Sequence, residues 1–128
     1  MFKIKSLDHI AIKVTDVEAS AVWYQETLGL KRMEYEEAWG KIPLMMFSES
    51  NNGIALFPVT NPPIRARSGL MHFAFLVDRE DFIAAQEELT KKGIAFVFQD
   101  HRATHSIYLH DPDGYEVEIT TYTIDWKG

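Results

Sequence analysis

Two histidines occupy equivalent positions in two similar segments of this chain. His9 lies in LDHIAIKV, residues 7–14, and His72 lies 63 residues later in LMHFAFLV, residues 70–77. A lone histidine beside an alanine is more often an ordinary core or surface residue than a ligand. A histidine at the same place in both copies of a repeat is harder to explain in that way. Because imidazole nitrogen is a common ligand of divalent first-row metals, His9 and His72 are candidate metal ligands.

A carboxylate, Glu118, is expected on the same face as the two histidines. Side chains alternate between the faces of a strand. The bulky residues of each segment therefore share one face, and each histidine lies on the other face next to a small alanine. In the last two expected strands, Tyr108 and Glu118 fall on the corresponding face. Two imidazoles and one carboxylate form the facial triad typical of non-haem Fe(II) enzymes, and Zn²⁺ suits the same ligands.

The repeat also indicates how many protein ligands the site has. Gly53 and Gly114 belong to two expected hairpin turns, and aligning them places Phe57 opposite Glu118. A symmetric four-ligand site would need a carboxylate or a histidine in place of Phe57. We therefore predict three protein ligands, which leaves open positions on the metal for other molecules.

A helical pattern follows each histidine segment. The first helix is expected over about residues 17–28, with a capping box formed by Thr15 and Glu18 and an end at Gly29. The second helix is expected over about residues 80–92. Apolar residues recur at helical spacing in both, so each helix is expected to pack one face on the core.

The order of elements predicts an α+β fold made of two βαβββ modules. Each helix is followed by a strand and then by a hairpin with a glycine turn. We expect a single domain over residues 1–128, with module 1 at about 5–60 and module 2 at about 69–124, joined by a linker that contains Pro62 and Pro63. The modules are expected to form a curved mixed sheet around a metal cleft, with the helices on the outer face.

The composition narrows the classes of function. The 128 residues suit one compact domain, and 46% are hydrophobic, which is enough for an ordinary core. A net charge of −6 makes nucleic acid an improbable partner. The absence of cysteine excludes thiolate metal sites and cysteine nucleophiles. No apolar run is long enough to span a membrane and no signal peptide is recognisable, so we expect a cytoplasmic protein without membrane contact.

Three separated motifs resemble the vicinal oxygen chelate superfamily, which includes glyoxalase I, fosfomycin-resistance transferases, bleomycin-binding proteins and extradiol dioxygenases. The motifs are LDHIAIKVTDVEASAVWYQETLGL, LMHFAFLV and SIYLHDPDGYEVEI, and the resemblance covers about residues 5–124. It implies paired βαβββ modules around a divalent metal, with ligands at His9, His72 and Glu118. It also implies a homodimer, in which the ligands come either from one chain or from two.

Within the superfamily, the last motif looks most like that of extradiol dioxygenases. Their pattern carries a histidine seven residues before a tyrosine, and the tyrosine ten residues before the ligand glutamate. His101, Tyr108 and Glu118 have these spacings. The resemblance implies cleavage of a catechol-like ring with Fe(II) or Mn(II), with His101 moving protons and Tyr108 hydrogen-bonding to the reacting oxygens. His105 is an alternative to His101, and Arg102 stands where a glycine is common.

Two other classes of function stay open at this point. A glyoxalase-like lyase or isomerase, or a thiol transferase, would work without O₂ and would tolerate Zn(II) or Ni(II). A non-catalytic protein that sequesters a small hydrophobic molecule would need no metal. In the extradiol interpretation, apolar side chains are expected to line the site around an aromatic ring, and the candidates are Tyr35, Trp39, Met46 and Phe57.

Overall fold

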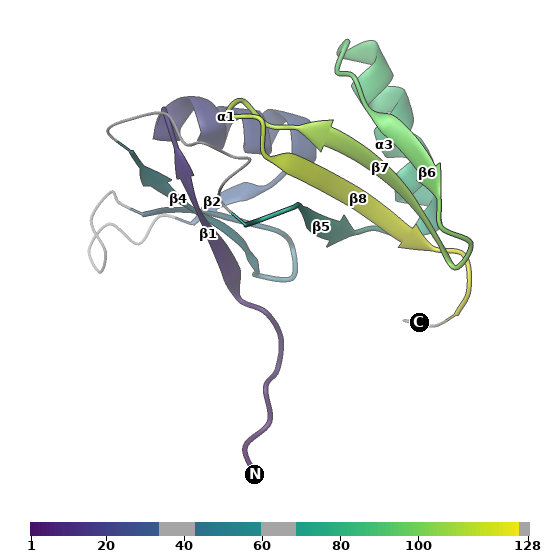
Figure 1. Ribbon diagram of the computed structural model, residues 1–128, viewed down its shortest axis with the longest axis horizontal. Coiled ribbons are helices and arrows are strands. Elements are labelled where there is room, and N and C mark those ends of the chain that lie inside the picture. The colour runs from purple at the N-terminus through teal and green to yellow at the C-terminus, as the bar shows by residue number, and fades with distance from the viewer. Residues whose placement is uncertain (34–42, 60–68, 126–128) are drawn as a thin grey trace. The chain divides into compact units, whose positions relative to one another are not determined.

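The computed structural model of the protein describes residues 1–33, 43–59 and 69–125. The chain divides into two compact units, residues 1–64 and residues 65–128. Each unit contains one helix and one four-stranded sheet among its described residues (Figure 1). The α+β class and the two βαβββ modules are therefore confirmed, with one sheet in each module.

The first unit holds a mixed sheet with the strand order β1-β4-β3-β2. Strand β1 is parallel to β4, and the other pairs are antiparallel. On β1, Ile12 and Val14 are buried while His9, Ala11 and Lys13 are exposed, as the alternation predicts. The elements are β1 (His9–Val14), α1 (Val17–Leu28), β2 (Lys31–Met33), β3 (Leu44–Phe47) and β4 (Gly53–Pro58).

Helix α1 has the expected bounds but not the expected cap. Its N-cap residue is Asp16, whose carboxylate accepts a hydrogen bond from the backbone N–H of Ala19 at 3.0 Å. The capping box expected from Thr15 and Glu18 was therefore placed one residue early. The carboxylate of Glu18 instead pairs with the guanidinium of Arg32 on β2, and this hydrogen bond lowers the pKa of Glu18. Gly29 ends the helix in the left-handed conformation, as predicted.

The second unit repeats this topology with the strand order β5-β8-β7-β6. Strand β5 is parallel to β8, and the other pairs are antiparallel. Helix α3 packs Phe82 and Leu89 into the core and covers one face of the sheet (Figure 1). The elements are β5 (Phe73–Leu76), α3 (Arg79–Lys91), β6 (Val97–Asp100), β7 (Thr104–His110) and β8 (Glu116–Tyr122).

The hairpin between β7 and β8 fixes the register of the strand that carries Glu118. The carboxylate of Asp111 accepts hydrogen bonds from the backbone N–H groups of Asp113 and Tyr115, at 3.0 and 2.8 Å. Gly114 has a φ of 82°, which only glycine adopts readily. This turn holds Tyr108 directly opposite Glu118 on the neighbouring strand.

Neither helix in the described ranges has the length and apolar character that a membrane crossing requires.

Candidate metal centre

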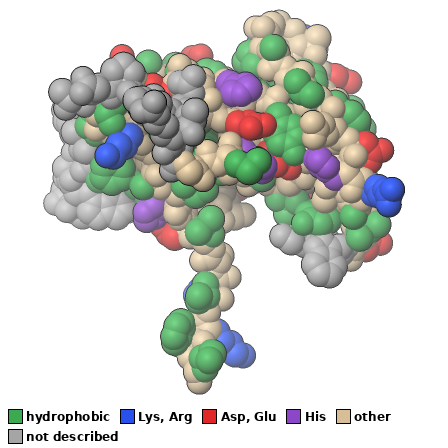
Figure 2. Space-filling model, viewed as in Figure 1, with side chains coloured by type: hydrophobic (Ala, Val, Ile, Leu, Met, Phe, Trp, Pro, Cys, Tyr) green, Lys and Arg blue, Asp and Glu red, His purple; other side chains and the backbone are tan. Residues whose placement is uncertain are grey.

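The face of the second sheet that α3 leaves uncovered carries the predicted site residues of this unit. In the register of the sheet, Glu118 on β8 lies between Ala74 on β5 and Tyr108 on β7. Laterally paired residues share a face, so these side chains stand side by side. Figure 2 shows histidine and acidic side chains gathered on this face of the second unit.

His72 and Glu118 meet at the start of β5. The imidazole Nε2 of His72 lies 3.0 Å from Oε1 of Glu118, and the side chains are 33% and 11% exposed. Two ligand atoms that each lie about 2.1 Å from one metal ion at a right angle are about 3.0 Å apart. The chemistry and the spacing of the two atoms therefore fit neighbouring ligands of a single divalent ion. In the described part of the chain, no three His, Asp or Glu side chains lie close enough together to hold a metal ion.

The second oxygen of Glu118 is held inside the sheet. Oε2 accepts a hydrogen bond from the hydroxyl of Ser106 at 2.7 Å, and the Ser106 oxygen lies 2.9 Å from that of Thr120. Ser106 is fully buried and Glu118 is 9% exposed. The carboxylate therefore offers one oxygen to the open face and keeps the other hydrogen-bonded to a buried hydroxyl.

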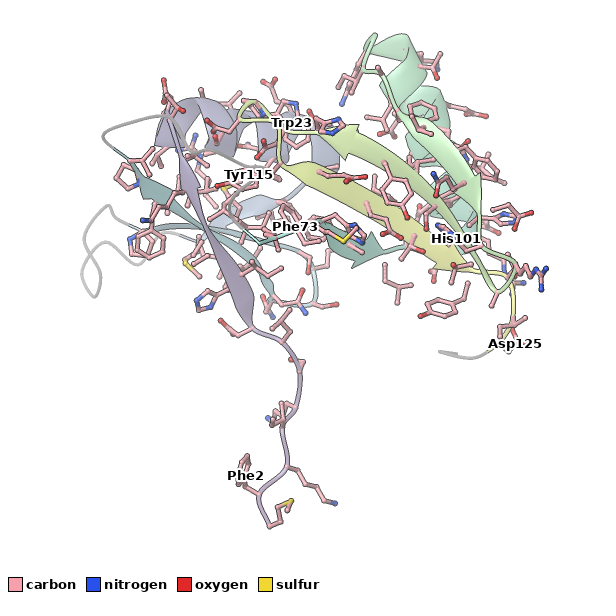
Figure 3. All side chains as sticks on the ribbon, viewed as in Figure 1. Phe2, Trp23, Phe73, His101, Tyr115 and Asp125 are labelled. Atoms are coloured by element: carbon pink, nitrogen blue, oxygen red, sulfur yellow. The ribbon has the colours of Figure 1, made fainter. Side chains whose placement is uncertain are left out.

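His101 and Tyr108 form a second pair on this face. Nε2 of His101 lies 3.0 Å from the phenolic oxygen of Tyr108, and the two rings meet edge to face. His101 follows the end of β6 and lies beside the strands of the second sheet (Figure 3). The ring of Tyr108 also contacts that of His72 edge to face, with 5.7 Å between the centroids. Tyr108 thus connects His101 to the candidate metal ligands.

Tyr108 is a hydrogen-bond donor at neutral pH. Burial raises the pKa of its phenol above 10.0, and the negative charge of Glu118 raises it further. Both effects disfavour the phenolate, since one removes water and the other adds a like charge. The phenol therefore keeps its proton throughout the physiological range.

The second unit has two other histidines, and only His105 lies apart from this arrangement. His105 points to the opposite face, where its ring contacts Phe82 and Phe98 and its Nε2 lies 3.4 Å from Oδ1 of Asp100. The structure therefore does not support His105 as a replacement for His101. His110 shares a pocket of about 350 Å³ with His72, at the end of the β7–β8 hairpin.

His9 begins β1 of the first unit, at the position equivalent to His72 in the second. The Nδ1 atom of His9 lies 2.7 Å from Oδ2 of Asp8. The carboxylate accepts the hydrogen bond from Nδ1–H, so the lone pair of Nε2 is left for another partner. Metal-binding histidines commonly donate their second ring nitrogen to a carboxylate in this way. Asp8 was not among the residues expected at the site, although its place directly before His9 in the sequence is a visible signal.

Apolar side chains surround the His9 face of the first sheet. Met45, Phe47 and Ala55 form a buried cluster, with Met33 and Phe57 packed against it. Phe57 is therefore on the expected face, paired with Lys13 of β1. Met46 is not, because Met45 is the residue that pairs with Ala55, and Met46 lies on the opposite face. The other two predicted wall residues, Tyr35 and Trp39, lie outside the described residues.

This combination of features defines a class of protein: two βαβββ modules, with a histidine at or just before the first strand of each and a glutamate on the last strand. Residues 6–119 match the Glyoxalase/Bleomycin resistance protein/Dioxygenase superfamily, and the chain belongs to it.

Individual relatives differ in their named activities. The chain is 30% identical over 120 residues to a catechol-2,3-dioxygenase of Bacillus subtilis, with 88% of this chain and 40% of that protein covered. It is 26% identical over 122 residues to the glutathione transferase FosA of Serratia marcescens, with 91% and 80% covered. The crystal structure of a glyoxalase/dioxygenase from Nostoc punctiforme superimposes with a TM-score of 0.75 at 25% identity, covering 94% and 92% of the two chains. The chain spans less than half the length of the dioxygenase.

Proposed function

We propose that this protein is a metal-dependent enzyme that cleaves the ring of a catechol-like diol in the extradiol manner. The observation that carries the proposal is the contact between His101 Nε2 and Tyr108 OH, 3.0 Å apart, beside the His72–Glu118 pair. An acid–base group, a neutral phenol and two ligand atoms on one sheet face meet the needs of proton transfer next to a bound diol. The similarity to a catechol-2,3-dioxygenase supports the same reaction class.

The proposed metal site uses His9, His72 and Glu118. The distance between His72 Nε2 and Glu118 Oε1 supports two of these ligands. The repeat equivalence and the Asp8 carboxylate on Nδ1 support His9 as the third. Fe(II) or Mn(II) held by these residues would supply Lewis acidity to the substrate.

The other residues act on the substrate. His101 accepts a proton from the diol on Nε2 and returns it to the product, while the Tyr108 phenol donates a hydrogen bond to a substrate oxygen. Because Tyr108 stays protonated, it stabilises negative charge that develops on that oxygen. Val97, which is paired with Tyr108 across the strands and is 59% exposed, offers an apolar contact to an aromatic ring.

Metal content tests the ligand set. Protein purified without oxygen should hold about one Fe or Mn per chain by elemental analysis. His72→Gln should lose it, because one ligand is gone. His105→Gln is the matched control, since His105 belongs to the same sheet but points to the other face, and it should keep the metal. Metal-free wild-type protein, even after incubation with Fe(II), Mn(II) and Zn(II), would contradict the proposal and favour a binding protein.

Oxygen consumption tests the reaction. Metal-loaded protein should consume one O₂ for each catechol-type diol cleaved, with the yellow absorption of the ring-opened product. His101→Asn should lower turnover by about a hundredfold or more while the metal content stays the same, because only proton transfer is affected. Loss of metal in His101→Asn would instead make His101 a residue of the metal site.

A thiol transferase is the second candidate, and the similarity to the glutathione transferase FosA supports it. The match covers 91% of this chain and 80% of that transferase. This hypothesis predicts that the protein consumes a thiol without O₂, and that it is active with Mn(II) or Zn(II) bound. If the metal-loaded protein does not cleave diols but conjugates glutathione to an epoxide, the thiol transferase reaction is supported and the ring-cleavage proposal is contradicted.

A further inference from the structure

The two oxygens of Glu118 have different surroundings. Oε1 faces His72 Nε2 at 3.0 Å on the open side of the sheet, and Oε2 receives the hydroxyl of Ser106 at 2.7 Å on the buried side. Ser106 has no exposed surface. A carboxylate this buried costs free energy unless its oxygens are hydrogen-bonded, so the serine is well placed to stabilise the charged form.

Thr120 orients the serine. The Ser106 and Thr120 oxygens are 2.9 Å apart, and Thr120 Oγ1 lies 3.3 Å from the backbone carbonyl of His105. Ser106 has a single hydroxyl hydrogen, and a carboxylate is a stronger acceptor than a hydroxyl. Ser106 therefore donates to Glu118 Oε2, with Thr120 Oγ1 as a neighbouring acceptor, and Thr120 donates its own hydroxyl hydrogen to the His105 carbonyl. The three side chains thus form one line of polar contacts from β8 through β7 and back to β8.

We propose that Ser106 is a positioning residue that occupies Oε2 of Glu118, so that the carboxylate presents Oε1 alone to the metal. This inference rests on the proposed metal site. A glutamate without that hydrogen bond could rotate or offer both oxygens to the ion. Ser106 therefore sets how Glu118 binds the metal without touching the metal itself.

Ser20 provides a matched control for removing a buried hydroxyl. Its side chain is 1% exposed, and among the described residues its hydroxyl is the buried side-chain polar group without a hydrogen-bond partner. Ser20→Ala should therefore leave both metal affinity and fold unchanged. Ser106→Ala removes the same atoms but deprives Glu118 Oε2 of its donor.

The experiment is calorimetric titration of metal-free protein with Mn²⁺, alongside the visible spectrum of the Co²⁺-loaded protein. Ser106→Ala should weaken Mn²⁺ binding about tenfold to a hundredfold. It should also lower the intensity of the Co²⁺ bands, because a second carboxylate oxygen raises the coordination number. Ser106→Thr keeps the hydroxyl and should restore both. A merely structural serine would alter the unfolding temperature without changing the Co²⁺ spectrum.

The outcomes separate this inference from the proposed function. Wild-type protein that binds no Mn²⁺ or Co²⁺ overturns the metal site and the inference with it. Wild-type protein that binds both, with Ser106→Ala equal to Ser20→Ala in affinity and spectrum, overturns the inference alone. If Ser106→Ala does not fold, Thr120→Val provides the test in its place. This variant should weaken Mn²⁺ binding about threefold to tenfold, because Ser106 loses a contact that orients it. An affinity for Mn²⁺ equal to that of the wild type would overturn the inference.

Discussion

Tyr108 connects the parts of the candidate site at the scale of single residues. It touches His101 through a hydrogen bond and His72 through its ring, and it is paired with Glu118 across the strands. Its neighbours on the sheet also explain its chemistry, because Glu118 and partial burial both raise the pKa of the phenol. A single tyrosine thus links the proposed proton-transfer residue to the proposed ligand carboxylate.

The raised pKa of Tyr108 predicts a late tyrosine titration. In metal-free protein, the difference in tyrosinate absorbance between wild type and Tyr108→Phe should show one phenol that ionises above about pH 10, the ordinary value. The folded state holds this proton more tightly than the unfolded state, so its contribution to stability is complete below about pH 10. That contribution is lost as the pH rises through the folded-state pKa. A midpoint at or below pH 10 would contradict the role assigned to Glu118.

Removal of the phenol should also reduce turnover. Tyr108→Phe deletes one preorganised donor and should lower turnover of the diol about a hundredfold, with unchanged metal content. Wild-type turnover in this variant would leave Tyr108 with a packing role only.

At the scale of elements, the two helices begin differently. Asp16 caps α1 through a hydrogen bond to Ala19 N, whereas Asp78, at the equivalent position of α3, makes no side-chain hydrogen bond to cap its helix. The sequence offers an aspartate in both places, and only the local backbone decides which one reaches an N–H group.

This contrast predicts unequal effects of two similar substitutions. Asp16→Ala should destabilise the protein by about 1 kcal/mol, the usual value of an N-cap. Asp78→Ala should cost no more than a few tenths of a kcal/mol, because only a weak charge effect at the helix end is lost. Urea unfolding of both variants measures the difference in the free energy of unfolding. Equal decreases in the two variants would show that the hydrogen bond from Ala19 N to Asp16 does not stabilise the fold.

Gly53 is required by close packing between β3 and β4. A Cβ at this position would lie 2.1 Å from the carbonyl oxygen of Met46, a backbone atom that cannot move aside without disturbing the strand. Gly93, by contrast, has open space around it and needs glycine only for its φ of 71°.

Two alanine substitutions separate these reasons. Gly53→Ala should destabilise the protein by about 3 kcal/mol, at the upper end of overpacking costs. Gly93→Ala should cost about 1 kcal/mol, the penalty for a side chain in the left-handed region. Thermal unfolding ranks the variants, and a larger loss for Gly93→Ala would contradict the packing argument at Gly53.

At the scale of the whole molecule, the proposed ligands come from both units, with His9 in the first and His72 and Glu118 in the second. We expect a homodimer, which light scattering should show as twice the 14.7 kDa of one chain. A monomeric mass at micromolar concentration would contradict this.

Mixed dimers of two inactive variants test how the units supply the site. When His9→Gln and His72→Gln chains are co-expressed, each chain lacks one proposed ligand that the other chain retains. If each site takes His9 from one chain and His72 from the other, one intact site forms in every mixed dimer, and isolated mixed dimers then hold about half a metal per chain. If each chain supplies all of its own ligands, the mixed dimer stays empty. Each single variant, expressed alone, is the control.

Much of this protein follows from local pattern in the sequence. The alternation of apolar side chains identified the buried faces of β1 and β5, and the left-handed glycines marked where α1 ends and where the β7–β8 hairpin turns. The resemblance to the extradiol motif implied a shared site for His101, Tyr108 and Glu118, and the strand register places Tyr108 beside Glu118. These features depend on a few adjacent residues and on the geometry of strands and helices.

Tertiary structure decided what depends on register and on packing between distant segments. Only the pairing of β3 with β4 put Met45 instead of Met46 on the His9 face, because a shift of one residue exchanges the two faces of a strand. Only the pairing of β6, β7 and β8 sent His105 to the far face and brought Ser106 to Glu118 Oε2. The sequence by itself thus identified the candidate metal ligands. The folded sheet decided which atoms of those residues point outward, because hydrogen bonds between strands position each side chain.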